Sequence, residues 1–370
     1  MDFRVLQREF HRTINIASRF VSTRSQLPIL ENIVLTAEKT RLTLKATNLE
    51  MFLVTSIGAK VNEEGEIAVR AKILGELIAN LEGEALDVVV KKEKVKLSSE
   101  GFEASIMGMN TADFPELSKK ESDGVEIGFE DLKKVLGKVM FSVSRDDTRP
   151  VLTGVLFSFM KDELVIAASD GFRLSKNSIK LKGLVSEEKK MIIPRGVLSE
   201  FVRMEKGENE SVKLGLNQKD KQVVFEFSGI VLGSRVIEGE YPDFGKIIPE
   251  KTNVKIVVGK EDLLRAVKTA SVFARDSGNV VRFEIKEGEI VVVSESAKSG
   301  VQKGRVAAKI EGDVSEMSIS FNFRFIEEFL GVVDRDSVVM ELTDSNSPGI
   351  FRVQGNDDFF HLIMPVRVQS

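Results

Sequence analysis

The 370-residue chain contains no cysteine and no tryptophan, and it has only one tyrosine and two histidines. The absence of cysteine excludes disulfides, cysteine-ligated zinc, iron–sulfur clusters and thiol nucleophiles together. It also suits a reducing compartment. The N-terminal stretch is charged from its second residue and lacks the apolar core of a secretory signal, and no later run approaches 18 apolar residues. We therefore expect a cytoplasmic protein without a membrane partner.

Residues and motifs typical of catalytic sites are also scarce in the sequence. The two histidines, His11 and His361, have no nucleophile beside them in the sequence. The chain has no nucleophile elbow, Walker A loop, dinucleotide-binding glycine motif or H-E-x-x-H motif. The acidic pair Asp146-Asp147 lacks the further spaced ligands that a metal site needs. The sequence therefore favours a protein that is not an enzyme and predicts no metal or cofactor.

The chain does contain a repeat. The phrase "LPILENIVL" returns as "RPVLTGVLF", which places Pro28 and Pro150 122 residues apart. The same offset aligns the chain without a gap from about residue 3 to residue 57, so that Leu42 falls on Leu164, for example. A chance match would not hold its register over such a length, so the first two thirds contain one unit written twice.

A third copy follows with small shifts. "GFEDLKKVLGKVMFSVSRD" in the second copy returns as "GKEDLLRAVKTASVFARD" at an offset of 131, and "VLFSFMKDELVIAASD" returns as "VRFEIKEGEIVVVSES" at 126. Aromatic-Pro-acid turns, "DFPEL" and "YPDF", close the first two copies and lead into polar linkers. These boundaries predict three domains, at residues 1–120, 124–249 and 253–370.

Each copy shows the same local patterns. In the second copy, Leu132, Leu136 and Val139 lie on one apolar helical face, and the other two copies open in the same way. Alternating β-branched runs such as "RLTLKATN" and "EIVVVSE" follow and are typical of antiparallel strands. A strand then leads into a second helix, for which Asn322 is a suitable N-cap in the third copy. The predicted fold class is α+β, with three repeated domains that each pack two helices on antiparallel sheets.

The charge distribution separates the opening helices from the rest of the chain. The formal net charge is −4, which argues against an open, wholly basic nucleic-acid-binding face. Each opening helix nevertheless carries two more basic than acidic residues, and Arg12, Lys134 and Arg265 fall in register. Helix surfaces that simply need charge would explain any single helix. Agreement among three copies suggests a channel that meets phosphates on its inside and repels them elsewhere.

Several phrases in order resemble one known family over the whole chain. They are "LPILENIVL", "RPVLTGVLF", "SDGFRLS", "GEYPDFGKIIP", "FNFRFIEEFL", "LTDSNSPGIF" and the terminal "HLIMPVRVQS". In these the chain resembles the beta subunits of bacterial DNA polymerase III, the sliding clamps. The resemblance implies the DNA clamp fold in a head-to-tail homodimer, which closes a six-domain ring around duplex DNA of any sequence. Such a ring tethers the polymerase as a processivity factor and catalyses nothing.

The resemblance also implies a peptide-binding pocket between the second and third domains. The DNA polymerase III catalytic subunit, the clamp loader complex and other proteins with a clamp-binding motif would dock there. Apolar side chains, a pliable methionine and two arginines at the rim would suit a peptide groove. The corresponding positions are Leu152, Ser169, Gly171, Phe172, Arg173, Leu174, Pro242, Lys246, Ile247, Leu362, Met364, Pro365, Val366, Arg367 and Val368.

Two further sets follow from the helix register and the resemblance. The DNA-facing set adds basic positions near the two repeated phrases and on the second copy's second helix: Arg12, Arg24, Lys134, Arg149, Arg195 and Arg265. The dimer-interface set combines an edge strand of the first domain with the opening helix of the third: Ala104, Ile106, Val272 and Phe273. The alternative from another class is an acidic, repeat-built protein scaffold that uses the same pocket but never surrounds DNA.

Overall fold

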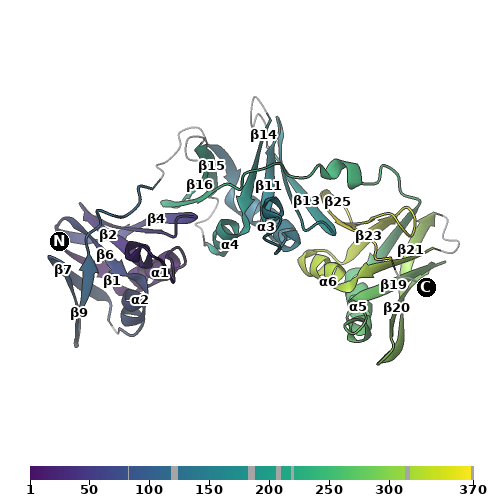
Figure 1. Ribbon diagram of the computed structural model, residues 1–370, viewed down its shortest axis with the longest axis horizontal. Helices are drawn as coiled ribbons and strands as arrows, with labels where there is room; N and C mark the ends of the chain where they lie inside the picture. The colour runs from purple at the N-terminus through teal and green to yellow at the C-terminus, as the bar shows by residue number, and fades with distance from the viewer. Residues whose placement is uncertain are drawn as a thin grey trace. The chain divides into compact units, whose positions relative to one another are not determined.

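The computed structural model describes residues 1–81, 83–117, 124–181, 188–205, 210–217, 221–312 and 317–367 (Figure 1). Val368, one of the predicted pocket residues, lies outside them. The chain divides into two compact units. The first unit comprises residues 1–129 and 203–236, and the second comprises residues 130–202 and 237–370. The second copy of the repeat is therefore shared between the two units.

Every copy has the same element order: a strand, a helix, four strands, a second helix and three strands, with β5 (Lys60–Glu63) as an addition in the first copy. The first copy contains β1 (Asp2–Leu6), α1 (Gln7–Ala17), β2 (Asn32–Glu38), β3 (Arg41–Thr47), β4 (Met51–Gly58), β6 (Gly65–Arg70), α2 (Ala71–Ala79), β7 (Ala85–Lys91), β8 (Lys94–Ser99) and β9 (Phe102–Met109).

The other two copies repeat this order. The second contains β10 (Val125–Gly128), α3 (Phe129–Val139), β11 (Gly154–Phe159), β12 (Glu163–Ser169), β13 (Arg173–Lys180), β14 (Lys189–Pro194), α4 (Arg195–Arg203), β15 (Ser211–Asn217), β16 (Gln222–Phe227) and β17 (Ile230–Arg235). The third contains β18 (Val254–Gly259), α5 (Lys260–Ala274), β19 (Val280–Lys286), β20 (Glu289–Ser296), β21 (Gly300–Gly312), β22 (Ser318–Asn322), α6 (Phe323–Val332), β23 (Ser337–Leu342), β24 (Gly349–Val353) and β25 (Asn356–Ile363).

These bounds confirm the predicted fold class and repeat. Helices α1 and α3, strands β3 and β12, and strands β4 and β13 each differ by the 122-residue offset at both ends. The side chain of Asn322 accepts a hydrogen bond from the backbone N–H of Arg324, as a helix N-cap does. The opening helices bury the predicted faces, for example Phe10, Ile14 and Ala17 on α1.

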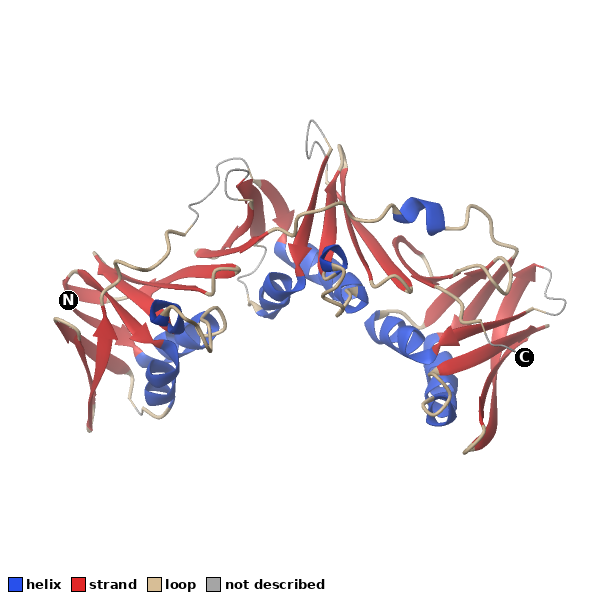
Figure 2. Ribbon diagram, in the orientation of Figure 1, coloured by secondary structure: helices blue, strands red, loops and turns tan. Residues whose placement is uncertain are grey.

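One sheet runs through each unit, and all strand pairs are antiparallel (Figure 2). In the first unit, β4 of the first copy pairs with β17 of the second, so that Leu53 lies opposite Leu232. In the second unit, β13 of the second copy pairs with β25 of the third, so that Leu174 lies opposite Leu362. Helices α1 and α2 contact each other, as do α5 and α6, and α5 packs on β19, β20 and β21. Strand pairing across two copies is thus what joins the copies within each unit.

Candidate functional site

An apolar cluster covers the β13–β25 junction in the second unit, and we call it the junction cluster. Its buried members come from β11–β14 and from β24–β25. Half-buried residues from the segment that follows β17 and from the C-terminal tail pack against them. The cluster consists of Leu156, Ala167, Leu174, Ile192, Ile350, Phe360 and Leu362, with Val151, Ile237, Tyr241, Phe244, Ile248 and Met364 around them.

Three of the predicted pocket residues, Leu174, Leu362 and Met364, belong to this cluster, and the predicted residues differ in exposure. Leu174 and Leu362 are fully buried, and Leu152 is nearly so. Met364 is half-buried. The side chain of Phe172 is 61% exposed. Buried leucines thus support a surface on which the half-buried and exposed members remain available to a partner.

The remaining predicted positions lie on two exposed segments. Pro242, Lys246 and Ile247 are exposed around the short 3-10 helix Phe244–Ile247. Pro365 and Val366 are half-buried and Arg367 is exposed. These two segments and the Ser169–Leu174 turn supply the accessible part of the predicted pocket.

Backbone hydrogen bonds fix the C-terminal tail beside the cluster. The N–H of Met364 donates to the carbonyl of Phe172 over 2.8 Å, which connects the tail to the turn after β12. The N–H of Val366 donates to the carbonyl of Ser320 on β22, also over 2.8 Å. Both ends of this short segment are therefore held, and its side chains have defined positions.

The turn between β12 and β13 is organised by its own side chains. Asp170 Oδ1 accepts hydrogen bonds from the backbone N–H groups of Phe172 and Arg173, at 2.9 and 3.1 Å. Gly171 has φ of +92°, a conformation that suits glycine. A Cβ there would also lie 2.8 Å from a guanidinium nitrogen of Arg149. The positive φ is therefore the reason that this turn needs glycine, whereas the guanidinium of Arg149 would only have to shift to admit a Cβ.

Arg149, which the sequence predicts among the DNA-facing residues, contacts this turn. Its guanidinium donates to the carbonyl of Asp170 over 3.2 Å and to Asp146 Oδ2, also over 3.2 Å. The hydrogen bonds from Thr148 hold the pKa of Asp146 below its usual value, and Arg149 lowers it further. Arg149 thus lies beside the predicted pocket residues of this turn through its hydrogen bond to the carbonyl of Asp170.

Arg173 is a buried residue of the junction and does not lie at a rim, where we expected it. Its side chain is 8% exposed and pairs with Asp170, 3.0 Å away, and with Glu328. It also donates to the carbonyl of Phe141 over 2.7 Å. Its guanidinium carbon lies 4.4 Å from the centre of the Phe325 ring. These contacts tie β13 to α6, so Arg173 connects the second and third copies.

His361, opposite Ser175 in the same junction, is likewise a core residue. It is fully buried, and its ring stacks on that of Phe329 with centres 5.6 Å apart. Its Nδ1 lies 2.8 Å from the hydroxyl of Ser175. Burial lowers the pKa of His361 well below its usual value, and the nearby charge of Arg173 adds to this effect. The histidine is therefore neutral at pH 7 and has a packing role.

The three in-register basic residues are exposed and form ion pairs. Arg12 pairs with Glu205 in the first unit, Lys134 pairs with Asp334 in the second, and Arg265 pairs with Asp262 on its own helix. Their side chains are 64%, 66% and 77% exposed, so each still presents charge to solvent.

Another basic residue of an opening helix, Lys138 on α3, is buried. Lys138 is 5% exposed and lies 3.0 Å from Asp334. Burial opposes ionisation of Asp334, but hydrogen bonds from Lys138 and Lys134 hold its pKa below the usual value. Lys138 thus belongs to the junction between the second and third copies.

The other predicted positions are placed as follows. Arg24 is exposed and Arg195, the first residue of α4, is half-buried. Ala104 and Ile106 are half-buried on β9. On α5, Val272 is 61% exposed and Phe273 is half-buried. Ala104 and Ile106 thus share one strand, and Val272 and Phe273 share one helix.

Sequence reasoning missed three aromatic members of the junction cluster: Tyr241, Phe244 and Phe360. Burial raises the pKa of Tyr241, whose hydroxyl lies against the backbone of Ser169. Tyr241 and Phe244 are the first and last residues of the "YPDF" turn, which the sequence indicated only as the end of a domain. The recurrence of that turn as "DFPEL" in the first copy could have identified it as a functional segment.

Two features are absent from the described part of the chain. None of its helices combines the length and apolarity needed to cross a membrane. Within the same residues, no three histidine, aspartate or glutamate side chains are grouped closely enough to hold a metal ion.

Comparison with known proteins places this geometry in a family. Three families match along the chain: the N-terminal domain of the DNA polymerase III beta subunit at residues 1–118, its central domain at 126–243 and its C-terminal domain at 245–367. The beta sliding clamp of Staphylococcus aureus is 27% identical over 99% of both chains, and that of Staphylococcus epidermidis is 28% identical over the same shares.

Solved structures agree with these relatives. The DNA polymerase sliding clamp from Bacillus subtilis superposes with a TM-score of 0.94 at 25% identity and covers all of both chains. The DNA polymerase III beta subunit from Thermotoga maritima does so with a TM-score of 0.89, also at 25% identity and over all of both chains. Because the matched families cover nearly the whole chain in order, the chain belongs to the DNA polymerase III beta subunit family, the sliding clamps.

Proposed function

We propose that two copies of this sliding clamp close head to tail into a ring around duplex DNA. The ring would act in the cytoplasm, without catalysis, as a processivity factor for the DNA polymerase III catalytic subunit. Each subunit would supply three domains, at residues 1–120, 124–249 and 253–370. The observation that carries the proposal is that β9 and β21 each have a stretch of one edge that no described strand covers. The equivalent edges of the other two copies, on β4, β13, β17 and β25, are paired within the chain.

The open edges follow from the repeat. Strands β4 and β13 each pair through their first residues with the last strand of the next copy, β17 or β25. The equivalent strand of the third copy is β21, whose residues Gly300–Ala307 pair only with β20 among the described strands. The last strand of the first copy is β9, whose residues Phe102–Met107 pair only with β8 among them. Edges of this kind are normally covered, and a head-to-tail dimer would cover both.

The repeat also predicts the register across this dimer seam. In β17, Leu232 lies opposite Leu53 of β4. Leu232 corresponds to Ala104 on β9, because each is the third residue of the strand that follows the same hairpin. Leu53 corresponds to Gln302 on β21, because Leu53 pairs with Ala46 of β3 as Gln302 pairs with Ser294 of β20. We therefore expect Ala104 of one subunit to lie opposite Gln302 of the other.

The opening helices support the same seam. Phe141, which follows α3, packs against the core of the third copy and lies 5.1 Å from the His361 ring, centre to centre. At the offset of 131, its counterpart in the third copy is Val272, which is 61% exposed. In a dimer, Val272 would pack on the first repeat copy of the partner subunit. Within one chain, Phe141 packs on the third repeat copy in the same way.

A cysteine pair tests this register directly, because the chain has no cysteine of its own. The double variant Ala104→Cys, Gln302→Cys is expected to form intermolecular disulfides on mild oxidation, since opposed antiparallel residues have suitable Cα separations of about 5 Å. Non-reducing electrophoresis would show a covalent dimer. The matched control Ala104→Cys, Ala308→Cys moves one partner six residues along β21, roughly 20 Å, and should stay monomeric. Equal cross-linking of both variants would contradict the register.

DNA retention would come from closure and not from tight contacts. The net charge of −4 makes strong open-face binding unfavourable. The exposed positions Arg12, Lys134 and Arg265 would offer weak, sequence-independent contacts to phosphates inside the ring, together with Arg24 and Arg195. Weak contacts of this type let a ring slide, whereas high salt would remove them.

The test of the proposal uses topology. Labelled protein is loaded on nicked circular DNA by a bacterial clamp loader with ATP and washed at high salt. We expect the clamp to stay on the circle and to be lost when a restriction enzyme cuts it. Equal retention before and after cutting would indicate ordinary affinity binding and would refute encirclement. Failure to load with loaders that load other bacterial clamps would favour a scaffold that never surrounds DNA.

The junction cluster is the proposed docking site for partners. Half-buried Met364, exposed Phe172 and Arg149 at the rim, above buried Leu174 and Leu362, would receive an extended peptide with apolar anchors. Each subunit has one junction cluster. The polymerase, the clamp loader and other clamp-binding-motif proteins would therefore compete for it.

A further inference from the structure

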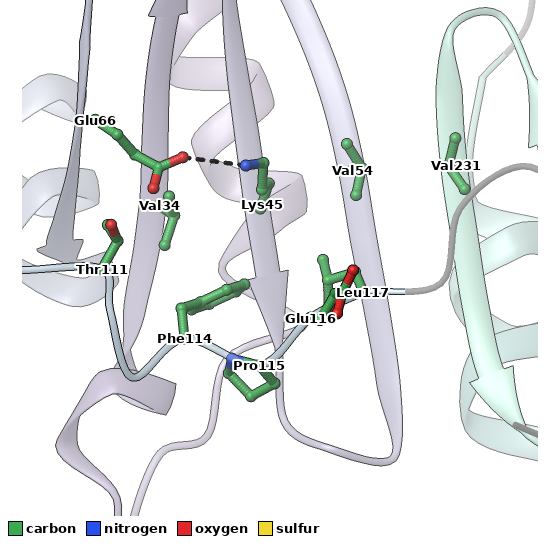
Figure 3. Close-up of a pocket in the computed structure, with 10 residues that line it drawn as sticks. All are labelled: Val34, Lys45, Val54, Glu66, Thr111, Phe114, Pro115, Glu116, Leu117 and Val231. Carbon is green, nitrogen blue, oxygen red and sulfur yellow. Dashed lines mark hydrogen bonds and ion pairs between the residues drawn. The ribbon is translucent and has the colours of Figure 1, made fainter.

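A second groove lies in the first unit, where the first and second copies join (Figure 3). It encloses about 700 Å³, a volume within the range of ligand sites. Strands β2, β3, β4 and β17 present Val34, Lys45, Val54 and Val231 to it. The segment from Thr111 to Leu117 crosses in front of these strands and forms the opposite wall, with the Phe114 ring directed inward.

This groove is the counterpart, in the repeat, of the junction cluster. At the offset of 122, Val34 corresponds to Leu156 and Lys45 to Ala167, both members of that cluster. Strand pairing extends the match, because Val231 lies opposite Val54 as Phe360 lies opposite Lys176.

The linker segment repeats as well. Phe114-Pro115 of the groove corresponds to Tyr241-Pro242, and Leu117 corresponds to Phe244. The same supersecondary unit therefore builds a surface of this kind twice, once in each unit.

Charge distinguishes the groove from its counterpart. Lys45 Nζ lies 3.1 Å from Glu66 Oε2, and the hydroxyl of Thr36 donates to the same oxygen over 2.6 Å. Burial opposes ionisation of Glu66, but hydrogen bonds from Thr36, Thr111 and Lys45 hold its pKa below the usual value. In the second unit, Ala167 stands at the position of Lys45 and Lys190 at the position of Glu66, so the two surfaces differ in the ligand chemistry they suit.

A second carboxylate gives the groove an excess of negative charge. Glu116 is exposed at the rim and forms no ion pair among the described residues. Because Lys45 is already matched by Glu66, the charge left for a ligand is that of Glu116. A cationic group beside apolar ones is therefore the complementary chemistry.

We propose that this groove is a second peptide-docking site, for a short extended segment of a partner protein with apolar side chains beside an arginine or lysine. The apolar side chains would lie against Val34, Val54 and Leu117, and the cation would meet Glu116. The inference uses the proposed function only for the peptide-binding role of the counterpart cluster; it requires neither ring closure nor DNA.

The test measures binding of a defined probe to the full-length protein. The probe is the synthetic peptide acetyl-Ala-Leu-Phe-Arg-Leu-Ala-amide, and its control has glutamate in place of arginine. With methyl-labelled valine and leucine, we expect the arginine peptide to shift the signals of Val34, Val54, Leu117 and Val231. The glutamate peptide should bind about tenfold more weakly. Absence of shifts at these methyl groups up to millimolar peptide would overturn the proposal.

Variants then separate this groove from the junction cluster. Glu116→Lys and Leu117→Ala should each weaken the probe about tenfold. Asp113→Lys, an exposed charge reversal three residues away and outside the lining, should have little effect. Met364→Ala in the junction cluster should also leave the affinity at the groove unchanged. If Met364→Ala abolishes binding while Leu117→Ala does not, the probe occupies only the junction cluster, which overturns the second site and leaves the proposed function intact.

Discussion

Replacing Arg173 by methionine is expected to lower the free energy of unfolding of the second unit by about 3–5 kcal/mol. The guanidinium is 8% exposed and is matched by Asp170 and Glu328. Methionine keeps most of the apolar stem but leaves the Asp170 carboxylate, 18% exposed, without its cation. The carbonyl of Phe141 loses its donor as well. Unpaired buried polar groups cost much more than a lost surface contact.

Urea titration followed by circular dichroism measures this loss. The matched control is Arg4→Met, because Arg4 pairs with Asp87 over 3.0 Å while both side chains are about half exposed. We expect at most about 1 kcal/mol for the control, since exposed ion pairs contribute little. A loss below about 1 kcal/mol in Arg173→Met would show that solvent already screens this pair and that the junction depends on apolar packing alone.

The repeat is the part of the fold that the sequence predicts best. A helix needs only a 3.6-residue apolar period and a strand only a two-residue alternation, and both can be read locally. The 122-residue offset found in the sequence also relates the bounds of α3, β12 and β13 to those of α1, β3 and β4. Polar turns between short alternating runs also predicted that the strands are antiparallel.

These local patterns could not predict which individual charged residues are buried. Arg173 and Lys138 lie in sequence beside exposed positions, and nothing local distinguishes them from surface charges. They are buried because β13 pairs with β25 and brings Glu328 and Asp334 to them from 155 and 196 residues away. Arg149 came to the Asp170–Gly171 turn for a similar reason, since its partner carbonyl is 21 residues distant.

The two junctions between repeat copies have the same strand register but different side chains. At the β13–β25 junction, Leu174 and Leu362 face each other. At the β4–β17 junction, the same positions hold Phe52 and Gly233, and a Cβ on Gly233 would lie 2.2 Å from the Phe52 ring. One large residue opposite glycine fills the space that two leucines fill elsewhere. The backbone register is thus a property of the repeat, while each junction's surface chemistry depends on its own side chains.

Truncating Met364 to alanine is expected to weaken a peptide with the clamp-binding motif of a polymerase by about 1–3 kcal/mol, which is roughly 5- to 150-fold in Kd. Met364 is half-buried, packs on the junction cluster and is fixed by the hydrogen bond from its N–H to Phe172. Its side chain is flexible enough to follow a ligand. Fluorescence anisotropy of the labelled peptide measures the affinity, and the dimer should remain intact in size-exclusion chromatography.

The same argument predicts a different outcome for Leu174→Ala. Leu174 is fully buried, so its truncation should also cost about 2–5 kcal/mol of stability through the cavity that it leaves. Met364→Ala therefore isolates binding, whereas Leu174→Ala combines binding with stability. Met160→Ala is the matched control, because Met160 is also half-buried but lies in the turn after β11 and outside the cluster. Equal peptide affinity in Met364→Ala, Met160→Ala and the unaltered chain would remove the junction cluster as the docking site.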